Sequence, residues 1–410
     1  MKKICIAIIS IALIIAFGIS LNNVEKTELQ STDGRDFEKA TVTEIVRSDY
    51  SDSTSKDYDG SVGEDDSVRA GQQQIKVKIR TGEHKGEILD ATSSSSYLYG
   101  ARCRIGTKVI VIISESDELT TVSVYNYDRG NQLYMIIAFF LIVLVLIGGF
   151  KGFKSAVGLV FTFCCILFVF MPLIYRGVSP IFAAAFVVII TTVVVMYLID
   201  GFTAKSICAI VGTIIGVVLA AVFAFIFGKI CHISGYNVDD IESLIYIGEM
   251  TDIKVGELMF AGILISALGA VMDVAMSVAS TINEIHDKNP KLDTKELFKS
   301  GINVGKDMMG TMSNTLILAF AGGSINTFVY IYSYNYQYYQ VLDMYSIGIE
   351  IIQGISATLG VILTVPIVSA ISAVALKKTY NKLGKKSYCY HHVKYIIIRR
   401  KQHRLSRRTI

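Results

Sequence analysis

Long uninterrupted apolar stretches fill the last two thirds of the chain. A helix needs about 20 mainly apolar residues to cross the hydrocarbon core of a bilayer. Seven stretches are long enough or nearly so, and we expect each to span the membrane: 133–149, 156–174, 181–199, 207–227, 258–282, 308–332 and 347–376. This pattern predicts a polytopic all-α membrane protein with a seven-helix transmembrane domain over residues 133–376.

The first residues have the pattern of an export signal. Lys2 and Lys3 precede an apolar run over residues 4–21, as in the charged and hydrophobic regions of a secretory signal. No Ala-x-Ala cleavage pattern precedes Asn22, which favours an uncleaved signal anchor and an eighth spanning helix. Cleavage would leave seven. In both cases the segment that follows is directed outward.

Residues 22–132 are polar overall and alternate as β-strands do. Gly82 and Gly86 punctuate one hairpin, and Gly106 precedes another strand. The expected strands are 40–46, 75–80, 87–90, 108–113 and 121–127. They predict a small extracytoplasmic β-barrel or β-sandwich. Residues 48–73, rich in Ser, Asp and Gly, are expected to form a flexible insertion.

The distribution of basic residues predicts the orientation. With the N-terminus inside, 22 Lys and Arg lie in cytoplasmic segments and three lie in short outer loops, the bias that cytoplasmic loops normally show. Both termini are then cytoplasmic if the anchor is retained. Residues 377–410 carry twelve of the 22 and no acidic residue. We expect this tail to bind anionic inner-leaflet lipids rather than nucleic acid.

One carboxylate falls inside an expected spanning helix. At mid-helix an Asp costs about 2.5 to 3.5 kcal/mol by insertion scales, so such a residue usually faces a partner or water. Asp273, Ser277, Ser280 and Glu284 recur at i, i+4, i+7 and i+11, which places them along one helical face. This polar stripe is a candidate functional surface.

The next expected helix repeats the arrangement with Asp307, Thr311, Asn314 and Thr315. At a rise of 1.5 Å per residue, Asp273 and Asn314 both lie roughly 10 Å from the inner membrane boundary. The two polar stripes are therefore expected to meet. Asp273 is the candidate acceptor of a proton or cation, and Thr311 and Asn314 are the candidate neutral ligands.

A structural interpretation of the same residues has comparable weight. Ser, Thr and Asn join membrane helices by hydrogen bonds worth about 0.6 kcal/mol on average, and a protonated Asp273 would add one donor. Glu284 and Asp307 lie near the membrane interface, where solvation explains them. Glu350, near the outer end of the last span, is explained at least as well by a solvated helix entrance as by a substrate contact.

Several chemical signatures are missing. The segment Gly301 to Asp307 is one residue short of a P-loop, lacks its Ser or Thr, and follows no strand. The seven cysteines include no Cys-x-x-Cys pair, and no hydrolase elbow or metalloprotease motif is present. The sequence therefore predicts a protein that is not an enzyme, with no metal and no cofactor.

The two polar helices resemble the YibE/F-like family of bacterial membrane proteins. The residues that carry the resemblance are Gly269-Ala-Val-Met-Asp273-Val-Ala-Met-Ser277-Val-Ala-Ser280 and Gly305-Lys-Asp307-Met-Met-Gly310-Thr311-Met-Ser-Asn314-Thr315-Leu-Ile-Leu-Ala-Phe320. The family pattern has arginine at 306 and tyrosine at 320, and neither difference removes the carboxylate or the Asn-Thr pair. The resemblance implies a multi-pass protein of the bacterial plasma membrane but no activity.

Two hypotheses follow. The first is a transporter or permease-like protein in which the Asp273 and Asn314 faces form a cavity open to the cytoplasm. The second is a membrane scaffold or sensor whose extracytoplasmic β domain binds a ligand or protein partner. The substrate and the oligomeric state stay open.

Overall fold

The computed structural model describes residue 18 and residues 34–49, 71–95, 100–116, 119–238 and 240–406, with the backbone alone beyond Lys377. The rest of the expected export segment, most of the expected insertion and the side chains of the tail lie outside the described residues. The chain divides into two compact units, residues 28–144 and residues 1–27 with 145–410.

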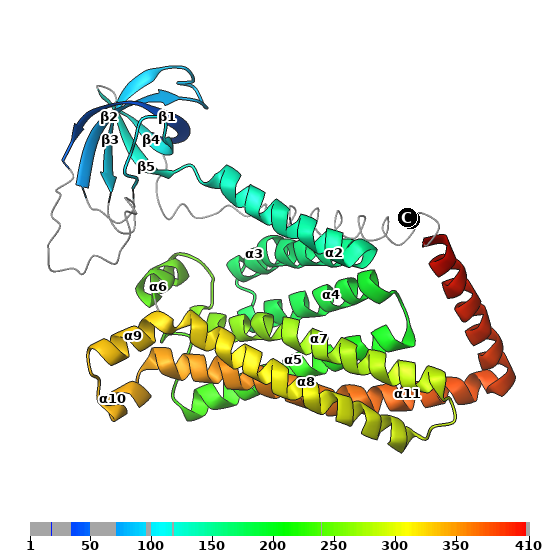
Figure 1. Cartoon of the computed structure of the whole chain (residues 1–410). Coiled ribbons are helices and arrows are strands. Elements are labelled where there is room, and N and C mark those ends of the chain that lie inside the picture. Colours follow the sequence, from blue (N-terminus) through cyan, green and yellow to red (C-terminus); the bar gives the residue numbers. More distant parts are fainter. Residues whose placement is uncertain are drawn as a thin grey trace. The chain divides into compact units, whose positions relative to one another are not determined.

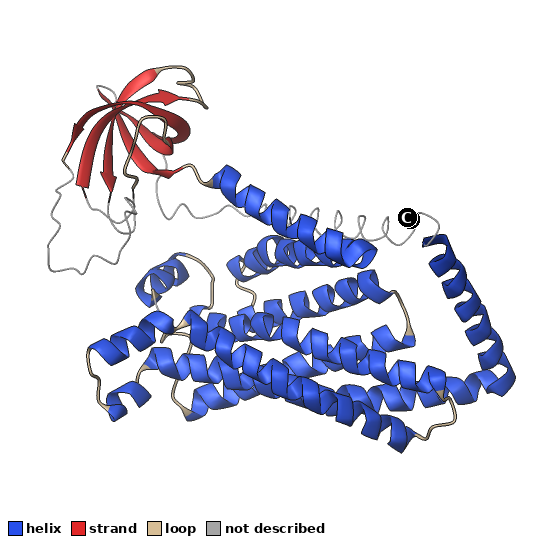
Figure 2. Ribbon diagram, viewed as in Figure 1, coloured by secondary structure: helices blue, strands red, loops and turns tan. Residues whose placement is uncertain are grey.

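The first unit contains a closed five-stranded barrel (Figures 1 and 2). Its strands are β1 Arg35–Ser48, β2 Gly71–Ile79, β3 Ile88–Ser95, β4 Lys108–Ser116 and β5 Leu119–Tyr127. The order around the barrel is β1-β2-β3-β5-β4, and all pairs are antiparallel except β3 with β5. The barrel alternative is confirmed over the sandwich, with a strand at each of the five expected places.

The connection between β2 and β3 folds over one inward-facing carboxylate. Glu38 is 5% exposed, and a Cβ on Gly82 would overlap its carboxyl group. Gly82 also has a φ of +74°, which L-residues rarely adopt. In the same connection, His84 places Nδ1 3.1 Å from Glu87 Oε2 and Nε2 2.9 Å from Glu115 Oε1. The hairpin glycine is therefore required by both backbone conformation and packing.

The second unit is helical. The helices begin with α2 Gly130–Cys165, whose residues up to Leu144 belong to the first unit. The next elements are η2 Ile166–Phe170, α3 Met171–Tyr175, α4 Pro180–Asp200, α5 Ala204–Ile230 and α6 Ile241–Met250. They continue with η3 Val255–Glu257, α7 Leu258–Lys288, α8 Thr294–Gly323, α9 Ile325–Ser333, α10 Tyr338–Leu342 and α11 Tyr345–Ser406. Helix α7 packs against α4, α5, α8 and α11, so one of its faces is buried along nearly its whole length.

Among the described residues, five helices are long and apolar enough to cross a membrane, or six if α8 and α9, bent by 60° at Ser324, form one span. The expected count of seven or eight is not confirmed. The first two expected spans fall in one run, Gly130–Tyr175, in which Gly149 breaks the helix with φ +54° and ψ −137°. Its 46 residues would form about 69 Å of straight helix, more than twice the hydrocarbon thickness, and the break at Gly149 divides them into two segments.

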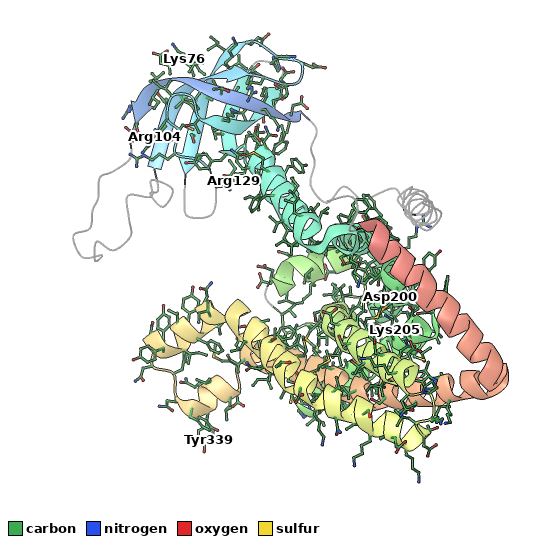
Figure 3. All side chains as sticks on the ribbon, turned by 45° about the vertical axis from the view of Figure 1, so that its right-hand side comes forward. Lys76, Arg104, Arg129, Asp200, Lys205 and Tyr339 are labelled. Atoms are coloured by element: carbon green, nitrogen blue, oxygen red, sulfur yellow. The ribbon has the colours of Figure 1, made fainter. Side chains whose placement is uncertain are left out.

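The connection between α4 and α5 is fixed by polar contacts. Asp200 and Lys205 form an ion pair at 2.6 Å (Figure 3), and the Thr203 hydroxyl accepts a hydrogen bond from the Ser206 backbone N–H at the start of α5, a standard N-cap. Lys154 Nζ donates to the Ile199 carbonyl at 3.1 Å. The basic residues expected on the cytoplasmic side here therefore lie at one end of the helical unit.

Glycines make the closest helix contacts in the core. A Cβ on Gly212 or Gly216 of α5 would overlap Val368 or Thr364 of α11. A Cβ on Gly305 of α8 would overlap Val365 of α11 in the same way. Small residues let membrane helices approach this closely. We call these contacts the glycine seam: Gly212, Gly216, Gly301, Gly305 and Gly360.

Candidate functional site

The exposed side of α7 is made of small and polar residues. Before its last turn, every exposed residue of this helix is Gly, Ser, Asp or Glu. Ser277 and Ser280 lie on the same side and are partly exposed. We call this set the α7 stripe: Gly262, Ser266, Gly269, Asp273, Ser277, Ser280 and Glu284. Its spacings of three and four residues keep it on one face of the helix.

The neighbouring helix α5 has an exposed face of a different kind. Before its last turn, which carries the exposed Lys229, the positions from 207 to 225 expose only aliphatic and aromatic residues at similar spacings: Ile207, Val211, Ile215, Val218, Val222 and Phe225. This α5 face is what a helix surrounded by lipid tails normally presents. The α7 stripe therefore differs from its surroundings in chemistry, although both faces are exposed in the single chain.

Asp273 is the central residue of the α7 stripe. Its side chain is exposed, and among the described residues nothing forms a hydrogen bond or ion pair with it. A Cβ on Gly262 or Gly269, in the N-terminal half of the stripe, would meet no atom within 4 Å. The space beside the carboxylate is therefore open along the helix.

Helix α8 carries a second exposed polar surface, as expected from its sequence. The exposed residues of its middle turns, which we call the α8 stripe, are Asn303, Lys306, Asp307, Gly310, Thr311, Asn314 and Thr315. The Thr311 hydroxyl donates to the carbonyls of Asp307 and Met308 at 3.2 Å, and the Thr315 hydroxyl donates to that of Thr311 at 2.9 Å. These bonds stay within α8. They leave hydroxyl lone pairs and the Asn314 amide facing outward.

Packing contacts fix the relative heights of the two stripes. A Cβ on Gly301 of α8 would lie 2.6 Å from Ile282 Cδ1 of α7, and Ala267 of α7 is in one cluster with Leu316 of α8. Asp273 lies nine residues before Ile282, and Gly310 lies nine residues after Gly301, so the two are at about the same height in an antiparallel pair. The shared cluster of Ala267 and Leu316, six residues from Asp273 and Gly310, gives the same register. Asn314 then lies about one turn, roughly 6 Å, from the height of Asp273.

No hydrogen bond among the described residues joins the two stripes directly. The expected meeting of Asp273 with Thr311 and Asn314 thus stays a prediction. Glu284 and Asp307 are both exposed. Glu350 is partly buried, and its Oε2 is inaccessible without a hydrogen-bond partner among the described residues. A fully solvated helix entrance does not describe that oxygen.

The sequence interpretation included four of the seven residues of the α7 stripe and missed Gly262, Ser266 and Gly269. The two glycines have no hydrogen-bonding side chain, and Ser266 was not linked to the pattern around Asp273. The interpretation also missed the packing role of Gly301 and Gly305, which belong to the segment that resembles a broken P-loop and approach α11. In both cases the available signal was the recurrence of small residues every three or four positions on one helical face.

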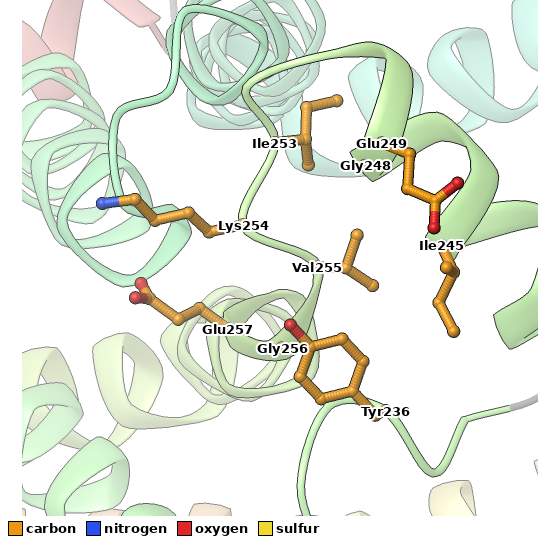
Figure 4. A pocket seen from close by; sticks show the side chains of 9 residues that line it. All are labelled: Tyr236, Ile245, Gly248, Glu249, Ile253, Lys254, Val255, Gly256 and Glu257. Carbon is orange, nitrogen blue, oxygen red and sulfur yellow. The ribbon is translucent and has the colours of Figure 1, made fainter.

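A separate open pocket lies beside α6, with a volume of about 500 Å³ (Figure 4). The Tyr236 ring packs on Gly256, where a Cβ would lie 2.7 Å from the ring. Lys254 and Glu257 extend toward one side, and Glu249 lies on the other. The Ser179 hydroxyl donates to Glu257. The lining residues are Tyr236, Ile245, Gly248, Glu249, Ile253, Lys254, Val255, Gly256 and Glu257.

Comparison with known families decides the classification. The model of the YibE/F-like protein family matches residues 136–378, which is more than half of the 410 residues. The chain belongs to the YibE/F-like family. No curated protein and no solved structure shows significant similarity to it.

The YibE/F-like match covers the helices and excludes the barrel strands, which end at Tyr127. Both polar stripes lie entirely inside it. Within the described residues, no group of three or more His, Cys, Asp or Glu is arranged to hold a metal ion. What this YibE/F-like chain offers chemically is an intramembrane carboxylate beside hydroxyls and an amide.

Proposed function

We propose that this YibE/F-like protein is a transporter or permease-like protein that moves a small solute along the α7 and α8 stripes. The observation that supports this proposal is the contrast between two exposed helix faces. Every exposed residue of the α7 stripe around Asp273 is small or polar, whereas every residue of the exposed α5 face is apolar.

The length of the stripe suits a path across the membrane. Gly262 and Glu284 are 22 residues apart, which is about 33 Å along a helix and close to the hydrocarbon thickness of about 30 Å. Leaving Asp273 against lipid costs about 2.5 to 3.5 kcal/mol on insertion scales. Water or polar protein groups beside the stripe remove that cost.

In this proposal Asp273 accepts a proton or a monovalent cation. Thr311 and Asn314 of α8 supply neutral oxygens near the same height, and Ser277, Ser280 and Glu284 line the approach from the cytoplasmic side. A proton or cation bound at Asp273 neutralises the carboxylate and so changes the free-energy cost of exposing the α7 stripe to lipid. Binding at Asp273 therefore favours one arrangement of the helices over another. That difference couples the ion to movement of the solute.

A membrane sensor is the second candidate, and a barrel observation favours it. Glu38 is nine-tenths buried beneath the β2–β3 connection, and its Oε2 has no hydrogen-bond partner among the described residues. Buried polar groups are normally paired. An outer barrel that binds a small cationic ligand at Glu38, with a bundle that anchors or relays, accounts for this carboxylate.

Proton movement in proteoliposomes tests the transporter proposal. Vesicles containing a pH-sensitive dye receive an imposed pH gradient, and the decay rate is compared with that of empty vesicles. We expect faster decay with the wild type, and decay near the empty-vesicle rate with Asp273→Asn. Glu242→Gln is the matched control, because that carboxylate is exposed on α6 and lies outside both stripes.

Equal decay for wild type and Asp273→Asn contradicts a role of Asp273 in proton movement. An equal loss of flux with Glu242→Gln would also contradict it, because the loss would then not be specific to the stripes. Removing residues 34–127 separates the two candidates, because a transporter keeps its flux without the barrel, whereas a sensor that only anchors or relays shows no flux with or without it.

A further inference from the structure

We propose that two copies of this chain pair through the α7 and α8 stripes, so that Asp273 of each copy is covered by α8 of the partner subunit. This inference rests on the proposed function, because it names the surface that encloses the same polar path. It also stands on packing observations of its own.

The first observation is a contrast between two sets of glycines. In the glycine seam, an added Cβ would overlap a neighbouring helix. At Gly262 and Gly269 of α7 and Gly310 of α8, an added Cβ would meet nothing within 4 Å. Glycine in a helix interior destabilises the helix relative to alanine. The seam glycines offset that cost by close packing, and the open ones have no such contact within a single copy.

The second observation is an uncovered carboxylate in a membrane span. Asp273 is exposed without a partner among the described residues. The apolar segment 4–21 has no polar side chain suited to a carboxylate except Ser10 and Ser20, and its described residue, Gly18, packs against Phe168 of η2. The cover that fits Asp273 must itself carry polar groups.

The α8 stripe of a second copy has the required chemistry and register. Asp273 and Gly310 lie at the same height, and the same relation pairs Gly269 with Asn314. A two-fold axis along the membrane normal brings α7 of one copy antiparallel to α8 of the other. Each larger polar side chain then lies over an open glycine: Asp273 over Gly310 of the partner subunit, and Asn314 over Gly269 of the partner subunit.

The pairing is reciprocal, as a two-fold interface requires. Each copy contributes one carboxylate and one amide, so two equivalent sites form. Small residues in the outer half of the α7 stripe allow close approach, while Ser277, Ser280 and Glu284 keep the cytoplasmic half polar. The site of a lone copy is incomplete, because its Asp273 faces lipid.

Disulfide formation between two differently tagged full-length copies tests the pairing in native membranes. With the native cysteines replaced, one copy carries Gly269→Cys and the other carries Asn314→Cys. We expect an oxidised band that contains both tags. The matched control replaces Gly269→Cys by Val218→Cys on the α5 face, and we expect several-fold less of the doubly tagged band.

A second measurement keeps the pairing testable if one of the cysteine variants does not fold. Subunits per particle are counted by single-molecule photobleaching in lipid nanodiscs for Gly269→Ile and Gly310→Ile, with Val218→Phe as a bulk-increasing control. We expect pairs for wild type and Val218→Phe, and mainly single copies for the two glycine variants. Single copies for the wild type overturn the pairing, and so does a doubly tagged band that is equal for Val218→Cys.

The two proposals fail in different ways. A single-copy protein with water-accessible stripes overturns the pairing and leaves the transporter proposal intact. A paired protein without proton movement overturns the transporter proposal and leaves the proposed pairing intact.

Discussion

Helices α5 and α7 pack against each other and expose opposite kinds of surface. The exposed α5 face is aliphatic and aromatic throughout, whereas the α7 stripe contains only Gly, Ser, Asp and Glu. Their buried faces are alike in being apolar or small. Within one bundle, then, exposure alone does not identify a lipid contact. The chemistry of the exposed residues does.

The difference follows from what each face contacts in a membrane. Lipid tails offer no hydrogen bonds, so Val218 costs nothing there and Asp273 costs several kcal/mol. A helix that keeps seven small or polar residues over its full length is stable in the bilayer only when that side meets water or polar protein groups. We infer that α5 borders lipid and that α7 borders a path or a partner.

The largest expected effect comes from exchanging the two chemistries. Val218→Asp places a carboxylate on the lipid side and should reduce membrane insertion by about 2.5 to 3.5 kcal/mol. Asp273→Val removes the carboxylate from α7 and should leave insertion unchanged or improved. The fraction of chain inserted in a glycosylation-based insertion assay measures both. Equal losses for the two variants would break the distinction between the faces.

A smaller effect is expected from two glycines of one helix. Gly305→Ala drives a methyl group into Val365, and overpacking of this kind costs about 1 to 3 kcal/mol. Gly310→Ala meets open space and should leave the stability of the single chain equal or slightly higher. Thermal unfolding of single copies in detergent compares them. A similar midpoint for both variants would contradict the packing of the glycine seam.

The smallest effect concerns the barrel, whose exposed polar groups serve as a comparison for the polar residues of the α7 stripe. The hydrogen bond to Glu87, with a further one to Glu115, raises the pKa of His84 above its usual 6.5. A raised folded-state pKa stabilises the barrel fully below about pH 6.5. This stabilisation is lost as the pH rises through the raised value.

Hydrogen exchange of the β2–β3 connection in the full chain measures this effect. At each pH the wild type is compared with His84→Gln, so that the intrinsic pH dependence of exchange cancels. We expect greater wild-type protection below about pH 6.5 and convergence of the two proteins at higher pH. A difference that persists unchanged at high pH would assign the protection to packing rather than to the charged imidazole.

Most of the fold could be predicted from patterns within short segments of the sequence. The five strands and the polar faces around Asp273 and Asn314 were readable because alternation and helical spacing are properties of short segments. Closure of the barrel was not, since it depends on the parallel contact of Thr92 with Ser123, 31 positions apart in the sequence. Such long-range pairing has no local signature.

Breaks inside apolar stretches were the second feature that could not be predicted from the sequence. The segment 308–332 was expected to be one span, and the chain bends by 60° within it, between α8 and α9 at Ser324. Gly322 and Gly323 precede the bend, but glycine pairs also serve close packing. The relative heights of the two stripes follow from contacts between helices, such as that of Ile282 with Gly301. The pattern of a single helix does not contain such contacts.

Water access to the two exposed faces distinguishes a polar path from simple helix packing most directly. Single cysteines at Ser277, Ser280 and Thr311, with the native cysteines replaced, are compared with cysteines at Val218 and Val222 of α5. A membrane-impermeant thiol reagent is applied from each side of the membrane. We expect labelling of the first three from the cytoplasmic side and protection of both α5 positions. Equal protection of all five would contradict a polar path, and helix packing would then explain the polar stripes.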